Sequence, residues 1–403
     1  MQNAKCKIDE AFRLRESLFH GNILHVDIRK AFAHKRIFKE NVSRFSLSRS
    51  LILHFAFCIL HFGLCPTNPN LITLPEKDII MNYYIGIDIG GTKCAVVRGD
   101  ENGTVTAKAR FLTTTPAETQ ATIYEETLRL ITEGRACGED PLAIGVSCGS
   151  PMDSKRGIIQ EPPNLLGWKD VHITEELTAR TGLPAYLCND ANACALAEWR
   201  FGAGRGTRNM VFCTFGTGFG AGLILDGKLY AGENDNAGEI GHIRLDTDGP
   251  LGYYKIGSVE GFCSGGGLRK LGQKHALKAI QEGISPAFCP TINDLDSVTA
   301  LSLANAAHAD PPDPTALAVW EECGRRLGYA MAILVDLLNP ARIVLGSIYA
   351  RSADLLCDAM NRVMREECLS PNLSVCEVVP AELTETVGDI AALTVAIEGI
   401  RNS

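Results

Sequence analysis

Two segments of the chain share one pattern: a short apolar strand, a glycine-rich turn that contains threonine, and a second apolar strand. They are residues 84–97, Y-I-G-I-D-I-G-G-T-K-C-A-V-V, and residues 211–228, V-F-C-T-F-G-T-G-F-G-A-G-L-I-L-D-G-K, about 128 residues apart. A single glycine hairpin says little, because such turns are common between strands. Two of them, each opening one of two successive α/β halves, predict two similar lobes that hold phosphate groups between them.

The first turn has residue types that suit the phosphates of a nucleotide. Gly90 and Gly91 carry no Cβ, so their backbone N–H groups can approach an anion closely. Lys93 can add a point charge, and Asp88 at the end of the strand can hold a magnesium ion through water. For this segment alone, an ordinary glycine hairpin is the alternative.

Length and composition indicate a globular protein of two domains. The 403 residues exceed one ordinary core, 46% of them are apolar, and the pI is about 5.7. This slightly acidic balance gives no indication of a nucleic-acid surface. The 15 cysteines form no C-x-x-C pair and lie singly in apolar runs, which favours reduced, packed thiols in a cytoplasmic protein.

Residues 1–80 differ sharply in composition from the rest of the chain. They hold 12 Lys+Arg against 7 Asp+Glu, while the remainder holds 27 against 40. Their one apolar run, residues 51–64, is too short to span a bilayer comfortably and too late for a secretory signal. We predict a poorly ordered extension ahead of a domain that begins near Met81; an upstream start assigned in error would produce one. A winged DNA-binding domain is the alternative, but we find no two well-capped helices around a glycine turn.

The rest of the chain alternates between strand and helix patterns. After the first hairpin we expect a strand at 104–109, an amphipathic helix at 118–134 and a buried strand at 142–148. In the last third we expect a helix at 316–338 that stops at Asn339-Pro340, a strand at 342–345 and a helix at 388–400. This order predicts an α/β protein.

Two polar side chains lie at positions where they could contact a ligand. Asn164, in the irregular segment 157–168, can offer an amide donor and acceptor to a sugar hydroxyl, or it can be an ordinary turn residue. Asp190 lies where a strand gives way to an alanine-rich helix. There it can cap the helix, or it can accept the proton of a substrate hydroxyl that attacks phosphorus.

A third segment, N-A-G-E-I-G-H at 236–242, carries Glu239 and His242 three residues apart. This spacing suits a metal or a sugar, but the residues that follow supply no cysteine and no second histidine, so structural zinc is not expected. A solvated glutamate and a hydrogen-bonded core histidine are the alternative. Further along, Gly346 ends a strand at a point where backbone can lie flat against a base or ribose.

Taken in order, six motifs resemble those of the ROK family of sugar kinases: D-I-G-G-T-K, P-P-N-L-L-G-W, N-D-A-N-A, F-G-T-G-F-G-A-G, G-E-I-G-H and E-G-F-C-S-G. The resemblance runs from about Tyr83 to the C-terminus. It implies the actin-like, ribonuclease-H-like ATPase fold, an α/β fold with a small lobe at 81–198 and a large lobe at 199–385. It also implies a C-terminal helix at 386–403 that packs back on the small lobe, and a homodimer.

The resemblance further implies a role for each site residue. Asp190 would be the general base. The hydroxyl groups of the sugar would be held by Asn164, Asn189, Glu239, His242 and Glu260. One side of the ATP phosphates would be lined by Asp88, Gly90, Gly91, Thr92 and Lys93, with Asp88 holding Mg²⁺ through water. The other side would be lined by Thr214, Gly216, Thr217 and Gly218, with Gly346 near the adenosine.

The chain departs from the family pattern at one place. Many members carry a zinc-binding run, C-x-C-G-x-x-G-C, and aligned on Glu260 its three cysteines fall at Leu251, Tyr253 and Ser258. We therefore expect no zinc site. We expect the packing of Tyr253 and Tyr254 to replace it.

These inferences predict a kinase that uses ATP and Mg²⁺ to phosphorylate a hexose, at the 6-hydroxyl of glucose or a related sugar. N-acetylmannosamine, N-acetylglucosamine, allose and fructose stay open as substrates. A sugar-responsive repressor of the same family is a second hypothesis, but the retained Asp88 and Asp190 favour catalysis. A chaperone-type ATPase without a sugar is a third, and the P-P-N-L-L-G-W and G-E-I-G-H segments argue against it. We expect neither a nucleic-acid nor a membrane partner.

Overall fold

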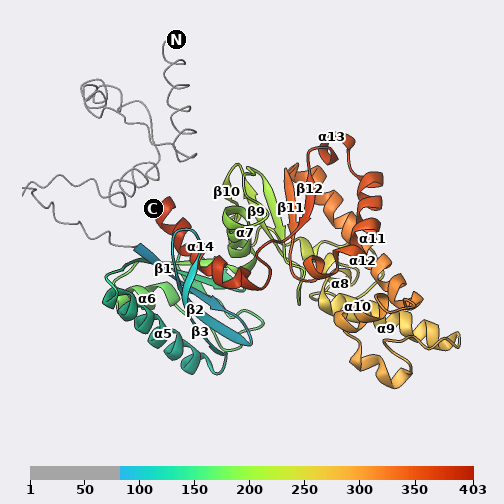
Figure 1. Cartoon of the computed structure of the whole chain (residues 1–403), viewed down its shortest axis with the longest axis horizontal. Coiled ribbons are helices and arrows are strands. Elements are labelled where there is room, and N and C mark those ends of the chain that lie inside the picture. The colour runs from blue at the N-terminus through green and yellow to red at the C-terminus, as the bar shows by residue number, and fades with distance from the viewer. Residues whose placement is uncertain (1–81) are drawn as a thin grey trace, which may run out of the picture. The chain divides into compact units, whose positions relative to one another are not determined.

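The computed structural model describes residues 82–403 (Figure 1). The expectations for residues 1–80, a poorly ordered extension or a DNA-binding domain, lie outside the described residues. Within residues 82–403, no helix is both long and apolar enough to cross a bilayer.

The first sheet contains five strands: β1 (Asn82–Ile89), β2 (Lys93–Gly99), β3 (Val105–Leu112), β4 (Asp140–Cys148) and β7 (Ala185–Asn189). Their order in space is β3-β2-β1-β4-β7. The first three strands are antiparallel, whereas β1, β4 and β7 are parallel. Parallel strands end at the same edge of a sheet, so Asp88 in β1 and Asn189 in β7 lie toward one edge.

Helices cover both faces of this sheet (Figure 1). They are α5 (Pro116–Ala136), α6 (Ile173–Thr181) and α14 (Val387–Asn402). Alternate residues of β1, from Tyr83 to Ile89, belong to the apolar core under α5 and α6, while Tyr84 packs with α14. The contact with α14 requires glycine, because a Cβ at Gly145 would lie 2.2 Å from the carbonyl oxygen of Ala392.

The second sheet repeats the order of the first. Its strands are β8 (Met210–Cys213), β9 (Ala221–Leu225), β10 (Lys228–Leu229), β11 (Arg342–Leu345) and β12 (Glu377–Pro380). They are arranged as β10-β9-β8-β11-β12, with an antiparallel hairpin followed by parallel strands. The α/β prediction is therefore confirmed, and each sheet begins with one of the two glycine hairpins.

The helices around the second sheet form the larger apolar core. They are α8 (Val259–Phe262), α9 (Gly265–Gln281), α10 (Ala300–Ala307), α11 (Pro314–Leu338), α12 (Ile348–Glu367) and α13 (Ser370–Leu373). The side chain of Asp313 caps α11 by accepting from two backbone N–H groups, and Asn339 ends it in the left-handed conformation, ahead of Pro340. The predicted stop of this helix is confirmed.

One helix packs on elements of both sheets. Helix α7 (Asp190–Phe201) contacts β8 and β9 and also α14, which covers the first sheet. Its Ala193 and Leu196 share one apolar cluster with Met210 and Val395. The remaining short elements are β5 (Met152–Asp153), β6 (Ile158–Ile159), η2 (Ile240–His242), η3 (Ile292–Ser297) and η4 (Thr384–Thr386).

Candidate active site

The first glycine turn is closed on itself and pressed against a neighbouring loop. The Gly90 N–H donates to the carbonyl of Lys93 at 3.1 Å. A Cβ at Gly91 would lie 2.6 Å from the carbonyl oxygen of Asn164, so this position requires glycine. Thr92 and Lys93 are exposed. The turn thus joins the Asn164 loop while its two polar side chains reach solvent.

Asp88, at the end of β1, has a shifted pKa. Its pKa is raised to about 6, chiefly by desolvation and then by the nearby carboxylates of Asp190 and Asp389, while Lys108 and a hydrogen bond from Ser147 oppose the shift. The carboxylate is half-buried. A carboxyl group whose pKa is shifted by desolvation and by like charges is typical of a functional site.

The second glycine turn is held by its own threonine. The Thr214 hydroxyl oxygen accepts from the Gly220 N–H at 2.8 Å, and the Gly216 N–H donates to the Gly218 carbonyl at 3.1 Å. The N–H of Phe219, in the same turn, donates to Oε2 of Glu260 at 3.1 Å. This turn is therefore tied to a residue predicted to bind the sugar.

The structure assigns the cap of α7 to Asn189. The Asn189 side-chain oxygen accepts from the N–H groups of Ala191 at 2.9 Å and Asn192 at 3.2 Å. Its amide nitrogen donates to the hydroxyl of Ser150 at 2.9 Å. The alternative in which Asp190 is the cap is wrong, because Asp190 is already the first residue of the helix. Its carboxylate is left to face the pocket.

Asp190 is exposed on the wall of a cavity, and the neighbouring protein partly desolvates its carboxyl group. This desolvation raises the pKa of its carboxyl above the ordinary value, and the hydrogen bond from the Ala191 N–H partly offsets the rise. A carboxylate with a raised pKa is a better proton acceptor near neutral pH.

A central cavity of about 430 Å³ brings most of the predicted site together. Of the predicted residues it is lined by Asn164, Asn189, Asp190, Thr214, Gly216, Thr217, Gly218, Glu239 and Glu260. None of the described residues that line it belongs to the first turn. That turn adjoins the cavity through the contact of Gly91 with Asn164 and the charge interaction of Asp88 with Asp190.

Sequence reasoning missed Asp235, which also lines the central cavity. Its carboxylate accepts from the N–H and the hydroxyl of Ser154, both at 2.7 Å, and so ties the hairpin of β5 and β6 to the loop after β10. The sequence offers little signal for this role, since the two residues are 81 positions apart.

An adjacent cavity of about 500 Å³ contains His242 together with Glu239, Glu260 and Tyr253. Glu239 and His242 are both exposed, so the alternative of a core histidine is wrong. Desolvation by the neighbouring protein atoms raises the pKa of Glu239, and the charges of Asp190 and Glu260 raise it as well. His242 lowers this pKa. The two cavities share Glu239 and Glu260 in their linings and form neighbouring sections of one site.

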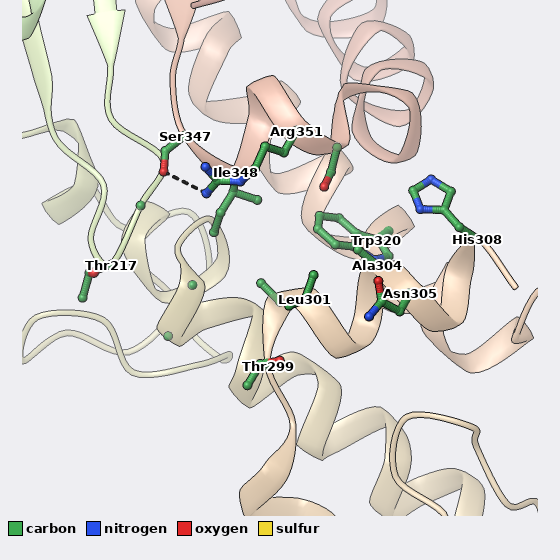
Figure 2. A pocket seen from close by; sticks show the side chains of 15 residues that line it. Thr217, Thr299, Leu301, Ala304, Asn305, His308, Trp320, Ser347, Ile348 and Arg351 are labelled. Carbon is green, nitrogen blue, oxygen red and sulfur yellow. Dashed lines mark hydrogen bonds between the residues drawn. The ribbon is translucent and has the colours of Figure 1, made fainter. Parts of the chain in front are cut away.

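Beyond the second turn lies a cavity of about 650 Å³ (Figure 2). Figure 2 shows Thr217 and Ser347 on one side and Leu301, Asn305 and Trp320 on the other. Trp320 is 1% exposed, and its indole N–H is buried without a hydrogen-bond partner among the described residues. Sequence reasoning missed these helical residues because only the fold brings α10, α11 and α12 together.

Gly346 lies in a smaller cavity of about 340 Å³ beside the one in Figure 2. Both cavities are lined by Gly216, Ser347 and Arg351. The Arg351 guanidinium donates to the Ser347 hydroxyl at 3.3 Å and pairs with Glu385 at 3.0 Å. Gly346 is therefore near the second turn, but it is absent from the lining of the central cavity.

The residues expected to replace a zinc site behave differently from the prediction. Tyr253 and Tyr254 are 55% and 86% exposed, and their rings contact each other rather than the core. The expectation that they pack in place of a metal is wrong. Residues Leu251, Tyr253 and Ser258 also lack the thiolate and imidazole donors that zinc prefers.

The chain matches known proteins over nearly all of the described residues. Residues 84–398 match the model of the ROK family. A glucokinase from Streptomyces coelicolor is 30% identical over 320 residues, covering 79% of this chain and 98% of that protein. A crystal structure of a ROK family glucokinase from Streptomyces griseus, in complex with glucose and AMPPNP, superposes with a TM-score of 0.62 and 30% identity, covering 79% and 100% of the two chains.

A second kind of protein has the same fold. A ROK family transcriptional regulator, a homologue of the E. coli Mlc protein, superposes with a TM-score of 0.68 at 24% identity, covering 78% of this chain and 77% of that one. This likeness shows the fold alone. The expected actin-like, two-lobe ATPase fold is confirmed, and the choice between kinase and regulator rests on the site residues.

Proposed function

Because the chain belongs to the ROK family, we propose that it is an ATP-dependent hexose kinase. One observation carries this proposal: the central cavity presents the Asp190 carboxylate, the second glycine turn and the polar side chains of Asn164, Glu239 and Glu260 to the same space. Phosphoryl transfer needs an aligned hydroxyl, a proton acceptor and a site for phosphates, and little covalent chemistry from the protein.

Asp190 accepts the proton of the sugar hydroxyl as its oxygen attacks the γ-phosphorus of ATP. The N-terminus of α7 favours the carboxylate form of Asp190, while desolvation favours the protonated form. The net effect is a raised pKa, so the carboxylate is a stronger base than that of a surface aspartate. The proton moves from hydroxyl to carboxylate while the bond from phosphorus to the leaving oxygen of ADP breaks.

The sugar is held by side chains that are already fixed. Both carboxylate oxygens of Glu260 accept backbone N–H groups, from Phe219 at 3.1 Å and from Tyr253 at 2.9 Å. Glu239, His242 and Asn164 offer further donors and acceptors around it. A site built on hydrogen bonds discriminates strongly between sugars, because a missing hydroxyl leaves a polar group unpaired.

The phosphates lie between the two glycine turns in this proposal. Asp88 would hold Mg²⁺ through water, since this ion is usually bound by one or two carboxylates together with the phosphates of the substrate. When bound, the ion would neutralise charge on the phosphate oxygens. Lys93 adds positive charge from the first turn, while Thr217 of the second turn, which lines the central cavity, would offer its hydroxyl to the phosphate tail.

The adenosine extends from the second turn into the cavity of Figure 2. The amide of Asn305 supplies a polar group there, and Leu301 supplies an apolar surface for a flat base. Gly346 allows the chain to pass close to the ribose. The cavity of about 650 Å³ has room for such a ligand.

The accepted sugar is glucose or a related hexose, phosphorylated at its 6-hydroxyl. The cavity of about 500 Å³ beside Glu239 also leaves space for a substituent, so an N-acetylhexosamine is the alternative substrate. An ATP-consumption assay with glucose, allose, fructose, N-acetylmannosamine and N-acetylglucosamine tests the proposal. Turnover with one sugar far above the rest supports it, and no turnover with any of them contradicts it.

We also propose a cytoplasmic homodimer without a nucleic-acid or membrane partner. The twelve cysteines among the described residues are all free, as is usual in a reducing compartment. The division into a small lobe at 81–198, joined by a C-terminal helix at 386–403, and a large lobe at 199–385 remains part of this proposal. Light scattering of the purified protein tests the dimer.

A sugar-responsive repressor is the second candidate function. The basic composition of residues 1–80 and the fold shared with a ROK regulator favour it. A repressor needs no general base, whereas Asp190 lines the central cavity and Asp88 is retained beside it. A gel-shift assay with DNA from upstream of the gene separates the two: binding that hexose releases, without ATP turnover, supports the repressor.

A further inference from the structure

The loop at 243–258 connects two residues that the proposed function assigns to the sugar. It leaves η2, which ends at His242, and enters α8, which carries Glu260. In zinc-bearing members of the family this is the metal-binding segment. Here Leu251, Tyr253 and Ser258 occupy the positions of the cysteines, and among residues 82–403 no group of three His, Cys, Asp or Glu side chains is arranged to hold a metal.

Cationic side chains hold this loop by its backbone carbonyl groups. The Lys255 ammonium donates to the carbonyl of His242 at 2.7 Å, and the Arg244 guanidinium donates to that of Ile256 at 2.9 Å. Lys270, on α9, donates to the carbonyl of Leu251. Hydrogen bonds from charged donors are stronger than neutral ones. These positive charges would also repel a divalent cation from the loop.

A fourth cation joins the loop to the helix that carries Glu260. The Arg326 guanidinium, on α11, pairs with the Asp246 carboxylate at 2.7 Å. The same group lies over the ring of Phe262, 4.5 Å from its centre. Phe262 belongs to α8 and is 1% exposed. Arg326 therefore fixes the beginning of the loop against the helix at its end.

The loop also makes direct hydrogen bonds to Glu260 and to the start of α8. The Tyr253 N–H donates to Oε1 of Glu260 at 2.9 Å, and the Ser258 hydroxyl oxygen accepts the Gly261 N–H at 3.1 Å, which caps α8. Ser258 thus stands at a cysteine position but serves as a helix cap. Displacement of the loop would shift both a hydrogen-bond partner of Glu260 and the helix that bears it.

We propose that the loop at 243–258 is a metal-free positioning element, in which Lys255 and Arg326 set the places of His242 and Glu260 and thereby the affinity for sugar. The inference rests on the proposed function, since it assigns those two residues to the sugar. It makes Lys255 and Arg326 positioning residues that act on sugar binding and leave the chemical step intact.

Steady-state kinetics with the preferred hexose test the positioning role. Lys255→Met and Arg326→Met are each expected to raise KM for the sugar about tenfold, because each loses a charge-assisted hydrogen bond, while kcat and KM for ATP stay within about twofold. Lys255→Arg, which can still donate to the carbonyl, should recover most of the loss. Lys228→Met, which removes an exposed lysine on β10, is the matched control. Unchanged sugar KM in both Met variants overturns the proposal.

Two further measurements do not depend on turnover. Elemental analysis of the purified protein should find less than about 0.1 zinc per chain, since the donor set does not suit zinc. Hydrogen exchange across 243–258 should be faster in Lys255→Met than in the control. One zinc per chain, or identical exchange, overturns the inference. If the wild type phosphorylates no hexose, the proposed function fails, and these two results still decide whether cations hold the loop.

Discussion

The two glycine turns are alike in sequence and different in their surroundings. The second turn lines the central cavity and both cavities beyond it, through Gly216. The first turn lines none of these three and is pressed against the loop of Asn164. The first carries the charged groups Asp88 and Lys93, whereas residues 214–220 contain no charged side chain.

The same glycine-turn motif, placed at equivalent positions in two sheets with the same strand order, therefore has two different roles. In the first turn glycine allows close packing against protein, while Thr92 and Lys93 beside it are exposed. In the second turn Gly216 leaves free space, since a Cβ there would meet nothing closer than 3.5 Å, whereas one at Gly218 would lie 2.7 Å from Oε2 of Glu260. Repetition of the fold therefore does not imply repetition of the chemistry. Each of the following changes tests one part of this comparison.

The largest effect is expected from the carboxylate between the turns. Asp190→Asn removes the proton acceptor but keeps the size and the helix start, so kcat should fall by about 10³-fold. Hexose binding, measured by thermal shift, should persist. Asp296→Asn changes a carboxylate that is 99% exposed and serves as the control. Activity close to that of the wild type would remove Asp190 from the mechanism.

The charge of the first turn gives the second test. Asp88→Asn should lower kcat by about 10²-fold, because the group proposed to hold Mg²⁺ is lost. Its folded pKa of about 6 exceeds its unfolded value of 3.8, so the folded protein binds more protons between these pH values. The free energy of unfolding of the wild type therefore falls as pH rises from about 4 to about 6.

Asp88→Asn removes that pH dependence. Without Mg²⁺, the variant should be more stable than the wild type at pH 7, by on the order of 2 kcal/mol, and equal to it at pH 4. Chemical unfolding at the two pH values checks this. A variant that is less stable than the wild type at pH 7 would show that the buried carboxylate has a favourable partner in the folded protein.

Matched glycine substitutions give the third and smallest effect. Gly91→Ala places a methyl group 2.6 Å from the Asn164 carbonyl oxygen, so it should cost about 1 to 3 kcal/mol of stability and about tenfold in kcat/KM for the sugar. Gly216→Ala meets only ordinary contacts. It should leave stability within about 0.5 kcal/mol and raise KM for ATP about threefold. Equal stability losses in the two variants would end the distinction between the turns.

The parts of the fold that sequence could predict are those with local signals. The glycine hairpins, the stop of α11 at Asn339-Pro340 and the change from strand to helix before Asp190 all depend on neighbours in sequence. The alternative in which Asp190 caps the helix was wrong by one position, because Asn189 and Asp190 are both good caps and only the backbone geometry distinguishes them. Such ambiguity is local and small.

The rest depended on contacts between distant segments. Ser154 with Asp235 and Arg326 with Asp246 join residues about 80 positions apart, and neither pair has a motif. The prediction for Tyr253 and Tyr254 failed because their aromatic character suggested that they pack into the loop. Instead the two side chains are exposed, and charged side chains hold the backbone of the loop. The roles of the individual site residues stay predictions until the variants are measured.

The close packing of α14 against the first sheet, which glycine residues in the strands allow, has a consequence for folding during translation. Residues 387–402 leave the ribosome almost two hundred residues after β7, the last strand of the sheet they cover. Until then one apolar face of that sheet has no partner, so the nascent chain carries an unfinished domain through most of translation. Shortening the chain at residue 386 would make that temporary condition permanent.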